Sequence, residues 1–206
     1  SPRGRNYLAA MACGANYAWA NRQILMHLTR EVFEKTLRIA SCELQMRLVY
    51  DVCHNIAKIE SFNLAGIEKK LCVHRKGATR AYPAGHEVVP ARHRTVGQPV
   101  LIPGDMGAGS YVLVGQEKAM SETFCSACHG AGRVMSRTQA IKSSRGRSIS
   151  RELADQGVLV MSAGKGTLSE EMPEAYKDLN DVVQVVHDAG IAKKVARLKS
   201  IACIKG

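Results

Sequence analysis

The sequence has no apolar run long enough to cross a membrane. A helix that spans the bilayer needs about 20 consecutive apolar residues, and polar or charged side chains interrupt every apolar segment of this chain before that length. Asn6, Asn16 and Asn21 also interrupt the apolar core of about 7 to 15 residues that a secretion signal needs. We therefore expect neither a membrane segment nor an export signal.

The cysteines lack a paired framework. There are seven of them, an odd number, scattered from Cys13 to Cys203. Small secreted domains instead carry even numbers of cysteines that close disulfides. The pattern favours free thiols in a reducing compartment, and we expect a cytoplasmic protein.

Acidic residues are in the minority: 18 Asp and Glu stand against 29 Lys and Arg, which gives a formal net charge of +11. A surplus of positive charge attracts polyanions, and nucleic acid is the commonest such partner of a globular protein. The 206 residues are 46% hydrophobic, which is enough to bury an ordinary core in one domain or two small ones.

Apolar periodicity and turn residues predict helices and strands without a regular strand–helix–strand repeat. A long amphipathic helix is expected over residues 5–36 and a surface loop over 80–98. Further helices are expected over residues 131–143, 149–156 and 179–189, and strands over 47–53, 70–75, 99–103, 110–114, 158–162 and 200–204. This mixture predicts an α+β fold with mixed sheets and packed helices.

The densest cluster of reactive side chains is CSACHGAGR, at residues 125–133. Read as C-x-x-C-H, it matches the attachment signature of c-type haem, in which His129 ligates iron. Read from the histidine onward, three small residues let backbone N–H groups approach an anion, and a following helix directs its positive end to the same point. In that interpretation His129 is a general base, a metal ligand or a covalent nucleophile.

Arg133 and Arg137 are one turn apart on the helix expected there, so both guanidinium groups can face the same phosphate groups. The alternative is a helix cap beside a solvated basic face. His54, at the end of an expected strand, is a candidate metal ligand. However, the sequence contains no H-x-H, H-E-x-x-H or paired C-x-x-C that would supply the two or three partners a metal needs.

A second glycine-rich loop, GDMGAGS at residues 104–110, joins two expected strands. It lacks the G-K-[ST] ending of a P-loop and the G-x-G-x-x-G spacing of a dinucleotide fold, so neither motif applies. A carboxylate such as Asp105 suits guanine, whose N1–H and N2–H₂ edge donates two hydrogen bonds. A plain turn between two strands is the alternative.

Several blocks resemble the RtcB family of RNA ligases. They are VCHNIAKIE at 52–60, VHRKGATRAYP at 73–83, GQPVLIPGDMGAGSYVLVG at 97–115, HGAGRVMSR at 129–137 and the final IKG. The blocks follow the family order across nearly the whole chain. The resemblance implies a partial RtcB-like fold, in which residues 1–206 are the carboxyl-terminal portion of the ligase domain. The family joins an RNA 3′-phosphate or 2′,3′-cyclic phosphate to a 5′-hydroxyl in tRNA splicing and RNA repair, with GTP and Mn²⁺.

The resemblance also implies roles for individual residues. His129 corresponds to the histidine that takes GMP as a phosphoramidate, and His54 corresponds to a manganese ligand. Arg133 and Arg137 are similar to positions that hold RNA phosphates. The other matches are nucleotide-binding positions: Asn55, Pro103, Gly104, Asp105, Met106, Ser110, Gly130, Ala131, Gly132, Tyr176 and Lys205.

The family's other metal ligands belong to an amino-terminal half that has no counterpart in this sequence. We therefore expect the lone polypeptide to bind Mn²⁺ weakly and to ligate poorly unless a partner chain supplies that half. RNA, GTP and an archease-like activator, which some family members use, are the other expected partners. The alternatives to a ligase are an RNA-binding remnant that has lost its catalysis and, more remotely, the c-type haem protein.

Overall fold

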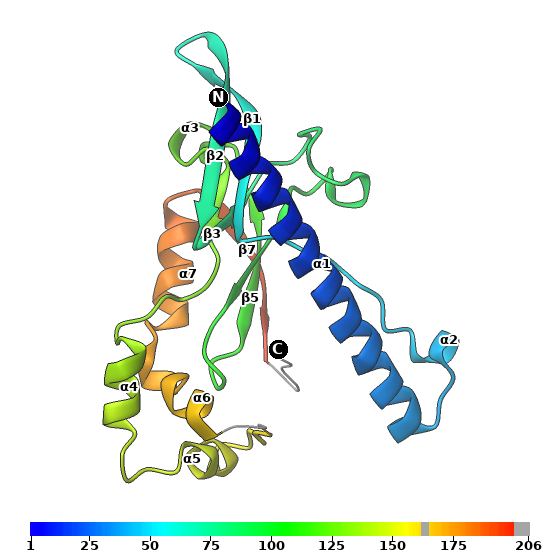
Figure 1. The fold of residues 1–206 in the computed structure, drawn as a ribbon, viewed down its shortest axis with the longest axis vertical. Coiled ribbons are helices and arrows are strands. Elements are labelled where there is room, and N and C mark those ends of the chain that lie inside the picture. The colour runs from blue at the N-terminus through cyan, green and yellow to red at the C-terminus, as the bar shows by residue number, and fades with distance from the viewer. Residues whose placement is uncertain (162–164, 200–206) are drawn as a thin grey trace. The chain divides into compact units, whose positions relative to one another are not determined.

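The computed structural model describes residues 1–161 and 165–199, and its helices and antiparallel sheets form an α+β fold, as predicted (Figure 1). The chain divides into two compact units, one of residues 1–76 and one that begins at Gly77. Among the described residues, no helix is both long and apolar enough to cross a membrane.

The first unit begins with a long helix, α1 (Pro2–Leu37), which confirms the helix expected over residues 5–36. The Ser1 hydroxyl caps its start by accepting a hydrogen bond from the Gly4 amide at 3.2 Å, and Pro2 occupies the first helical position, where its missing N–H has no consequence. Arg38 ends the helix in a left-handed conformation. A single turn, α2 (Ser41–Leu44), follows.

The same unit contains an antiparallel hairpin of β1 (Asn55–Leu64) and β2 (Ile67–Lys76), in register from Asn55 opposite Lys76 to Leu64 opposite Ile67. Its two-residue turn, Ala65–Gly66, has positive φ at both positions, which is the geometry of a type I′ turn. The strand predicted over residues 70–75 therefore exists within β2.

The strand predicted over residues 47–53 is wrong. That segment has no regular secondary structure and runs beside α1. Side chains of the helix hold it there: Arg22 forms an ion pair with Asp51 at 2.7 Å, and Arg30 donates to the carbonyl oxygen of Met46 at 3.0 Å. Further along, the rings of Tyr7 and His74 stack at 5.6 Å between α1 and β2.

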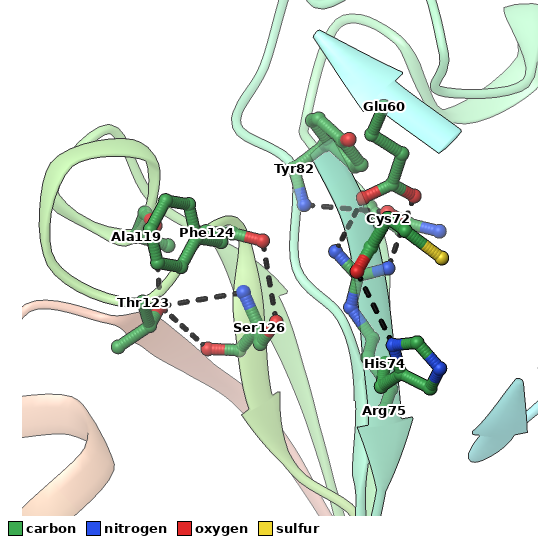
Figure 2. Close-up of polar contacts among 10 residues, drawn as sticks. Glu60, Cys72, His74, Arg75, Tyr82, Ala119, Thr123, Phe124 and Ser126 are labelled. Atoms are coloured by element: carbon green, nitrogen blue, oxygen red, sulfur yellow. Dashed lines mark hydrogen bonds and ion pairs between the residues drawn. The ribbon is translucent and has the colours of Figure 1, made fainter. Parts of the chain in front are cut away.

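An ion pair is buried in the hairpin. The Arg75 guanidinium on β2 donates two hydrogen bonds, of 3.0 and 2.7 Å, to the two carboxylate oxygens of Glu60 on β1 (Figure 2). The side chains are only 1% and 7% exposed. This parallel, two-bond geometry is the strongest form of an Arg–carboxylate pair.

The second unit contains a three-stranded antiparallel sheet in the order β4 (Pro99–Pro103), β5 (Ser110–Gly115), β7 (Ala192–Leu198). The hairpin of β4 and β5 confirms the two strands predicted on either side of the glycine-rich loop. Helix α7 (Leu179–Asp188), which confirms the helix expected over 179–189, adds Leu179 and Val183 to the sheet's core. A short ribbon pairs β3 (Ala78–Arg80) with β6 (Ser126–Cys128), and Ala127 of β6 and Ala81, which directly follows β3, belong to the same core.

A second cluster of apolar side chains joins the short helices of this unit. Its elements are α4 (Arg137–Ser143), α5 (Ile149–Asp155), α6 (Lys165–Glu170) and the 3₁₀ turn η2 (Pro173–Ala175). Its buried residues are Ala140, Ile149, Leu153, Met172 and Ala175. Outside the cluster, α3 (Lys118–Glu122) precedes β6, and η1 (Ala91–His93) lies in the predicted surface loop.

Two predictions for this unit are corrected and one lies outside the described residues. The helix expected over 131–143 begins only at Arg137, and residues 158–161 are irregular rather than a strand. The helix expected over 149–156 is α5. The strand expected over 200–204 lies outside the described residues.

Candidate functional site

His129 directly follows β6, which pairs antiparallel with β3 so that Ala78 lies opposite Cys128. The imidazole is half-buried. It lies against the backbone of Gly77, where a Cβ atom would stand 3.5 Å from its Nε2 atom. The predicted nucleophile is therefore at the end of a strand, beside a position with no side chain.

A strained turn fixes the direction in which β6 leaves α3. Phe124 and Cys125 both have positive φ, 49° and 50°, which costs a residue other than glycine roughly 1–2 kcal/mol. The Thr123 hydroxyl donates to the Ser126 carbonyl oxygen at 2.7 Å and accepts from the Ser126 amide at 3.3 Å (Figure 2). The Ala81 amide also donates to the Cys125 carbonyl oxygen at 2.7 Å. These hydrogen bonds stabilise the turn that sets the direction of β6, and therefore the position of His129 at its end.

The loop after His129 contacts the glycine-rich loop. The Ala131 amide donates to the Pro103 carbonyl oxygen at 3.2 Å, and a Cβ at Gly130 would stand 3.5 Å from the same oxygen. Gly104 donates to the Gly109 carbonyl oxygen at 2.9 Å, and a Cβ there would be crowded, because it would stand 2.9 Å from a methyl carbon of Leu179, 3.0 Å from the Cβ of Ala108 and 3.1 Å from the Gly109 carbonyl oxygen. The structure therefore brings together Pro103, Gly130 and Ala131, three of the predicted nucleotide-binding positions.

Asp105 shapes the glycine-rich loop itself. Its Oδ1 atom accepts hydrogen bonds from the amides of Gly107 at 2.7 Å and Ala108 at 2.9 Å, which is an Asx turn. Met106 packs against the helical core cluster, and Ser110 begins β5 opposite Pro103. The guanine contact of Asp105 remains a prediction.

Arg133 and Arg137 are not on one helix, contrary to the sequence prediction. Arg133 precedes α4 and forms an isolated β-bridge with Tyr176, whereas Arg137 is the first residue of α4. The local reason is that the amides of Val134 and Met135 donate to the Ala175 carbonyl oxygen, so this stretch pairs with another segment instead of coiling.

The Arg133 guanidinium belongs to a polar cluster around Tyr176. It lies 4.9 Å from the centre of the Tyr176 ring, donates to the Tyr176 hydroxyl at 3.0 Å and pairs with the Glu171 carboxylate at 3.4 Å. The Tyr176 hydroxyl in turn donates to Glu171. Burial, and then the hydrogen bond to Glu171, raises the pKa of Tyr176. Arg137 is exposed and pairs with Glu170 only at 3.8 Å.

His54 and Asn55 lie in the first unit, on a groove of about 480 Å³ between α1 and the start of β1. Both are exposed, and β1 begins at Asn55, so His54 precedes a strand rather than ending one. The groove is lined by small and apolar side chains together with a few polar ones: Tyr7, Ala10, Met11, Gly14, Ala15, Ala18, Arg22, Cys53, His54 and Asn55.

The described residues do not assemble a metal site. No three His, Cys, Asp or Glu side chains among residues 1–161 and 165–199 come together in a way that could hold an ion. A firmly bound transition metal needs at least three protein ligands. His54 alone therefore does not make a manganese site in this part of the chain.

The local sequence does not reveal that Gly77 lies beside His129, because that proximity depends on the pairing of β3 with β6. It also does not reveal Glu170 and Glu171 as the carboxylate partners of the two arginines. Nothing in the local sequence distinguishes these residues from ordinary strand or helix positions. Lys205 lies outside the described residues.

Comparison with known proteins identifies the family. The model of the family described as tRNA-splicing ligase RtcB matches residues 1–206. The chain belongs to the RtcB family. Three similar curated proteins, each called tRNA-splicing ligase RtcB, come from Archaeoglobus fulgidus (55% identical), Thermococcus kodakarensis (52%) and Methanococcus maripaludis (50%). Each alignment covers all of this chain but only 43% of the relative, so the chain spans less than half the length of these RtcB proteins.

Membership in the RtcB family confirms the resemblance seen in the sequence blocks. The two interpretations of CSACHGAGR differ in what they require of its two cysteines. Cys125 is fully buried, and burial raises the pKa of the Cys128 thiol, so neither sulfur is a ready nucleophile for a haem vinyl group. The haem hypothesis is set aside.

We expect Gly77→Ala to lower the reactivity of His129. The new methyl group would stand in contact with Nε2, and the positive φ of 76° costs an alanine about 1–2 kcal/mol of stability. Gly85→Ala is the matched control, since Gly85 has a φ of 82° and nothing within 4 Å of its Cβ position. Both variants should lose similar stability in urea titrations, but only Gly77→Ala should slow modification of His129 by diethylpyrocarbonate. Equal rates in the two variants would contradict the placement.

Proposed function

We propose that this chain is the nucleotide-transfer part of a GTP-dependent RNA ligase and that His129 carries GMP between GTP and RNA. The observation that carries the proposal is the position of the imidazole. It lies at the end of β6, between the side-chain-free Gly77 and the Gly130–Gly132 loop. Family membership supports the reaction class, because the relatives named above are called tRNA-splicing ligases.

The transfer needs one nitrogen lone pair and one good leaving group. A neutral His129 nitrogen attacks the α-phosphorus of GTP, a P–N bond forms, the P–O bond to the β-phosphate breaks, and pyrophosphate leaves. The RNA 3′-phosphate, after opening of any cyclic ester, then takes the GMP from the nitrogen. Finally the 5′-hydroxyl attacks that activated phosphate and releases GMP. Protonation of the imidazole in the second step makes it a good leaving group.

The neighbouring residues have complementary tasks in this proposal. The glycines at 104, 130 and 132 let the backbone approach the nucleotide phosphates, and Asp105 and Ser110 offer acceptors and donors to it. Tyr176 is the proposed neighbour of guanine, and Asn55, Pro103, Met106, Ala131 and Lys205 complete the proposed nucleotide set. Arg137 is the readier of the two proposed RNA-phosphate ligands, because it is exposed and its ion pair is long, whereas Arg133 must leave its bonds to Tyr176 and Glu171.

Manganese belongs to this proposal only with ligands from elsewhere. His54 is the one proposed ligand in the described part of the chain, and it belongs to no group of three or more His, Cys, Asp or Glu side chains there. We therefore assign no step of the transfer to a metal held by these residues alone.

We propose that this chain works together with a polypeptide that corresponds to the part of an RtcB protein outside the matched 43%. Helix α1 has no buried residue, and Tyr17, Trp19 and Val32 on it are 80%, 58% and 61% exposed. Apolar side chains left open along a whole helix indicate a surface that another polypeptide covers. RNA, GTP and an archease-like activator are the other proposed partners, and the proposed compartment is the cytoplasm.

A complementation experiment tests the function. This chain replaces the matching segment of the Archaeoglobus fulgidus relative, and the chimera is mixed with GTP, MnCl₂ and two RNA pieces ending in a 2′,3′-cyclic phosphate and a 5′-hydroxyl. We expect joined RNA from the chimera and very little from the 206-residue chain alone. RNA that is bound, with an affinity that falls steeply with salt, but not joined by the chimera would instead indicate a binding remnant and contradict the proposal.

A further inference from the structure

We propose that Thr79 is a positioning residue for His129: its hydroxyl, through one buried water, hydrogen-bonds a ring nitrogen and selects the imidazole tautomer. The inference rests on the proposed function only in assigning His129 the role of nucleophile. Thr79 belongs to none of the residues assigned above to the nucleotide, the RNA or the metal.

The first observation is an orphaned polar atom. Thr79 is 2% exposed, and its Oγ1 atom is the buried side-chain oxygen or nitrogen atom without a hydrogen-bond partner among the described residues. A buried hydroxyl that lacks a partner costs about 1–3 kcal/mol. A native structure retains such a group where a water, a ligand or a functional neighbour satisfies it.

The second observation is where this hydroxyl lies. Thr79 is the central residue of β3 and pairs with Ala127 of β6, and residues directly opposite each other in an antiparallel pair point to the same face. Along β6 the side chains alternate, so His129, two residues beyond Ala127, continues that face. Gly77 directly precedes β3, and a Cβ added there would stand 3.5 Å from Nε2 of His129. The orphaned hydroxyl and the nucleophile therefore share one face of one ribbon.

The spacing suits a hydrogen bond through one water. Diagonal neighbours on one face of an antiparallel pair are about 7–8 Å apart between backbone positions. A threonine hydroxyl and an imidazole that extend from such positions are separated by roughly one water molecule, which needs a polar, buried place of this kind. That water accepts a hydrogen bond from the N–H of one ring nitrogen.

The chemical consequence concerns the other ring nitrogen. A neutral imidazole has one N–H and one lone pair, and the partner of the N–H decides which nitrogen keeps the lone pair. Attack on phosphorus requires that the lone pair be on the nitrogen that faces the nucleotide. The hydroxyl of Thr79 would thus keep His129 in its reactive tautomer before GTP arrives.

The test is the ¹⁵N NMR spectrum of the His129 ring in the 206-residue chain, recorded through a pH titration. Three variants are compared with the parent: Thr79→Val, which keeps the shape without the hydroxyl, Thr79→Ser, which keeps the hydroxyl, and Thr138→Val, a control on the exposed face of α4. We expect one dominant tautomer in the parent, in Thr79→Ser and in Thr138→Val. In Thr79→Val we expect a mixture of tautomers and a titration midpoint lowered by about 0.5 pH unit, because the lost acceptor also stabilised the protonated ring.

Arg80 and Cys128, the other titratable groups on β3 and β6, are the same in every variant, so they do not account for a difference. Thr79→Ala, which adds no atom to the core, gives the same readout if Thr79→Val fails to fold. Identical tautomer ratios and midpoints in the parent and in the hydroxyl-free variants would overturn the proposal. The NMR measurement uses no GTP and no RNA. A chimera that fails to join RNA would contradict the proposed function, but it would leave the tautomer result unchanged.

Discussion

His129→Ala should abolish the transfer of ³²P from α-labelled GTP to the chimera, a loss below detection. The imidazole supplies the only atom that bonds to phosphorus in the proposed first step, and alanine offers no substitute. Folding should be nearly unchanged, because His129 is half-buried at the end of a three-residue strand rather than inside a core cluster. Phosphor imaging of denaturing gels measures the labelling, and circular dichroism measures the fold.

His27→Gln is the matched control for that experiment. His27 is on α1, its side chain is 68% exposed, and its contact is a surface pair with Glu31. This variant should be labelled like the parent. Labelling that survives in His129→Ala would show that another residue takes the nucleotide, and loss of labelling in both variants would show that the chimera depends on histidines in general.

Glu60→Ala should lower the free energy of unfolding of the first unit by about 3–5 kcal/mol, the usual effect of removing one member of a buried ion pair. The substitution leaves the Arg75 guanidinium, 1% exposed, without the carboxylate that accepts its two hydrogen bonds. The destabilisation comes mainly from keeping the Arg75 charge buried without this carboxylate, rather than from the lost attraction between Arg75 and Glu60. Urea unfolding followed by the signal of Trp19, on α1 of the same unit, measures it.

A surface pair provides the comparison. Glu31 on α1 contacts His27 and Lys35 with a side chain that is 42% exposed, so Glu31→Ala should cost no more than about 0.5 kcal/mol. The double variant Glu60→Leu, Arg75→Met, which removes both charges, should recover most of the stability lost by Glu60→Ala. A Glu60→Ala effect as small as that of Glu31→Ala would contradict the burial of the pair.

The sequence predicted the elements whose signals are local. The apolar periodicity of residues 5–36 extends over a long stretch, and α1 forms there. The turn at Gly104–Gly109 separates two apolar runs, and β4 and β5 pair across it. Strand β7 was not predicted, because residues such as Lys193 and Arg197 give it the composition of a solvated segment and only its pairing with β5 makes it a strand.

The wrong predictions have a common physical origin. Residues 131–136 do not coil because Ala131, Val134 and Met135 bond to the distant carbonyl groups of Pro103 and Ala175. Residues 47–53 do not form a strand because side chains of α1 hold them. Hydrogen bonds between segments far apart in sequence outweigh local propensity in both places, and one sequence gives no sign of them.

The sequence likewise predicted some features of the candidate site and missed others. The sequence blocks named His129 and the two loops beside it, because the residue types and their order are characteristic of the family. They did not reveal that Gly77 lies beside His129, or that Arg133 binds Tyr176 and Glu171. Those contacts join segments that only the folded chain brings together.

The central claim is that the nitrogen of His129 carries GMP, and peptide mapping by tandem mass spectrometry tests it most directly. The chimera is incubated with GTP and MnCl₂, digested at alkaline pH to preserve a P–N bond, and searched for the added mass of one guanylyl group, about 345 Da on the modified nitrogen. We predict this mass on His129 and nowhere else. The same mass on a lysine or on another histidine, with His129 unmodified, would contradict it.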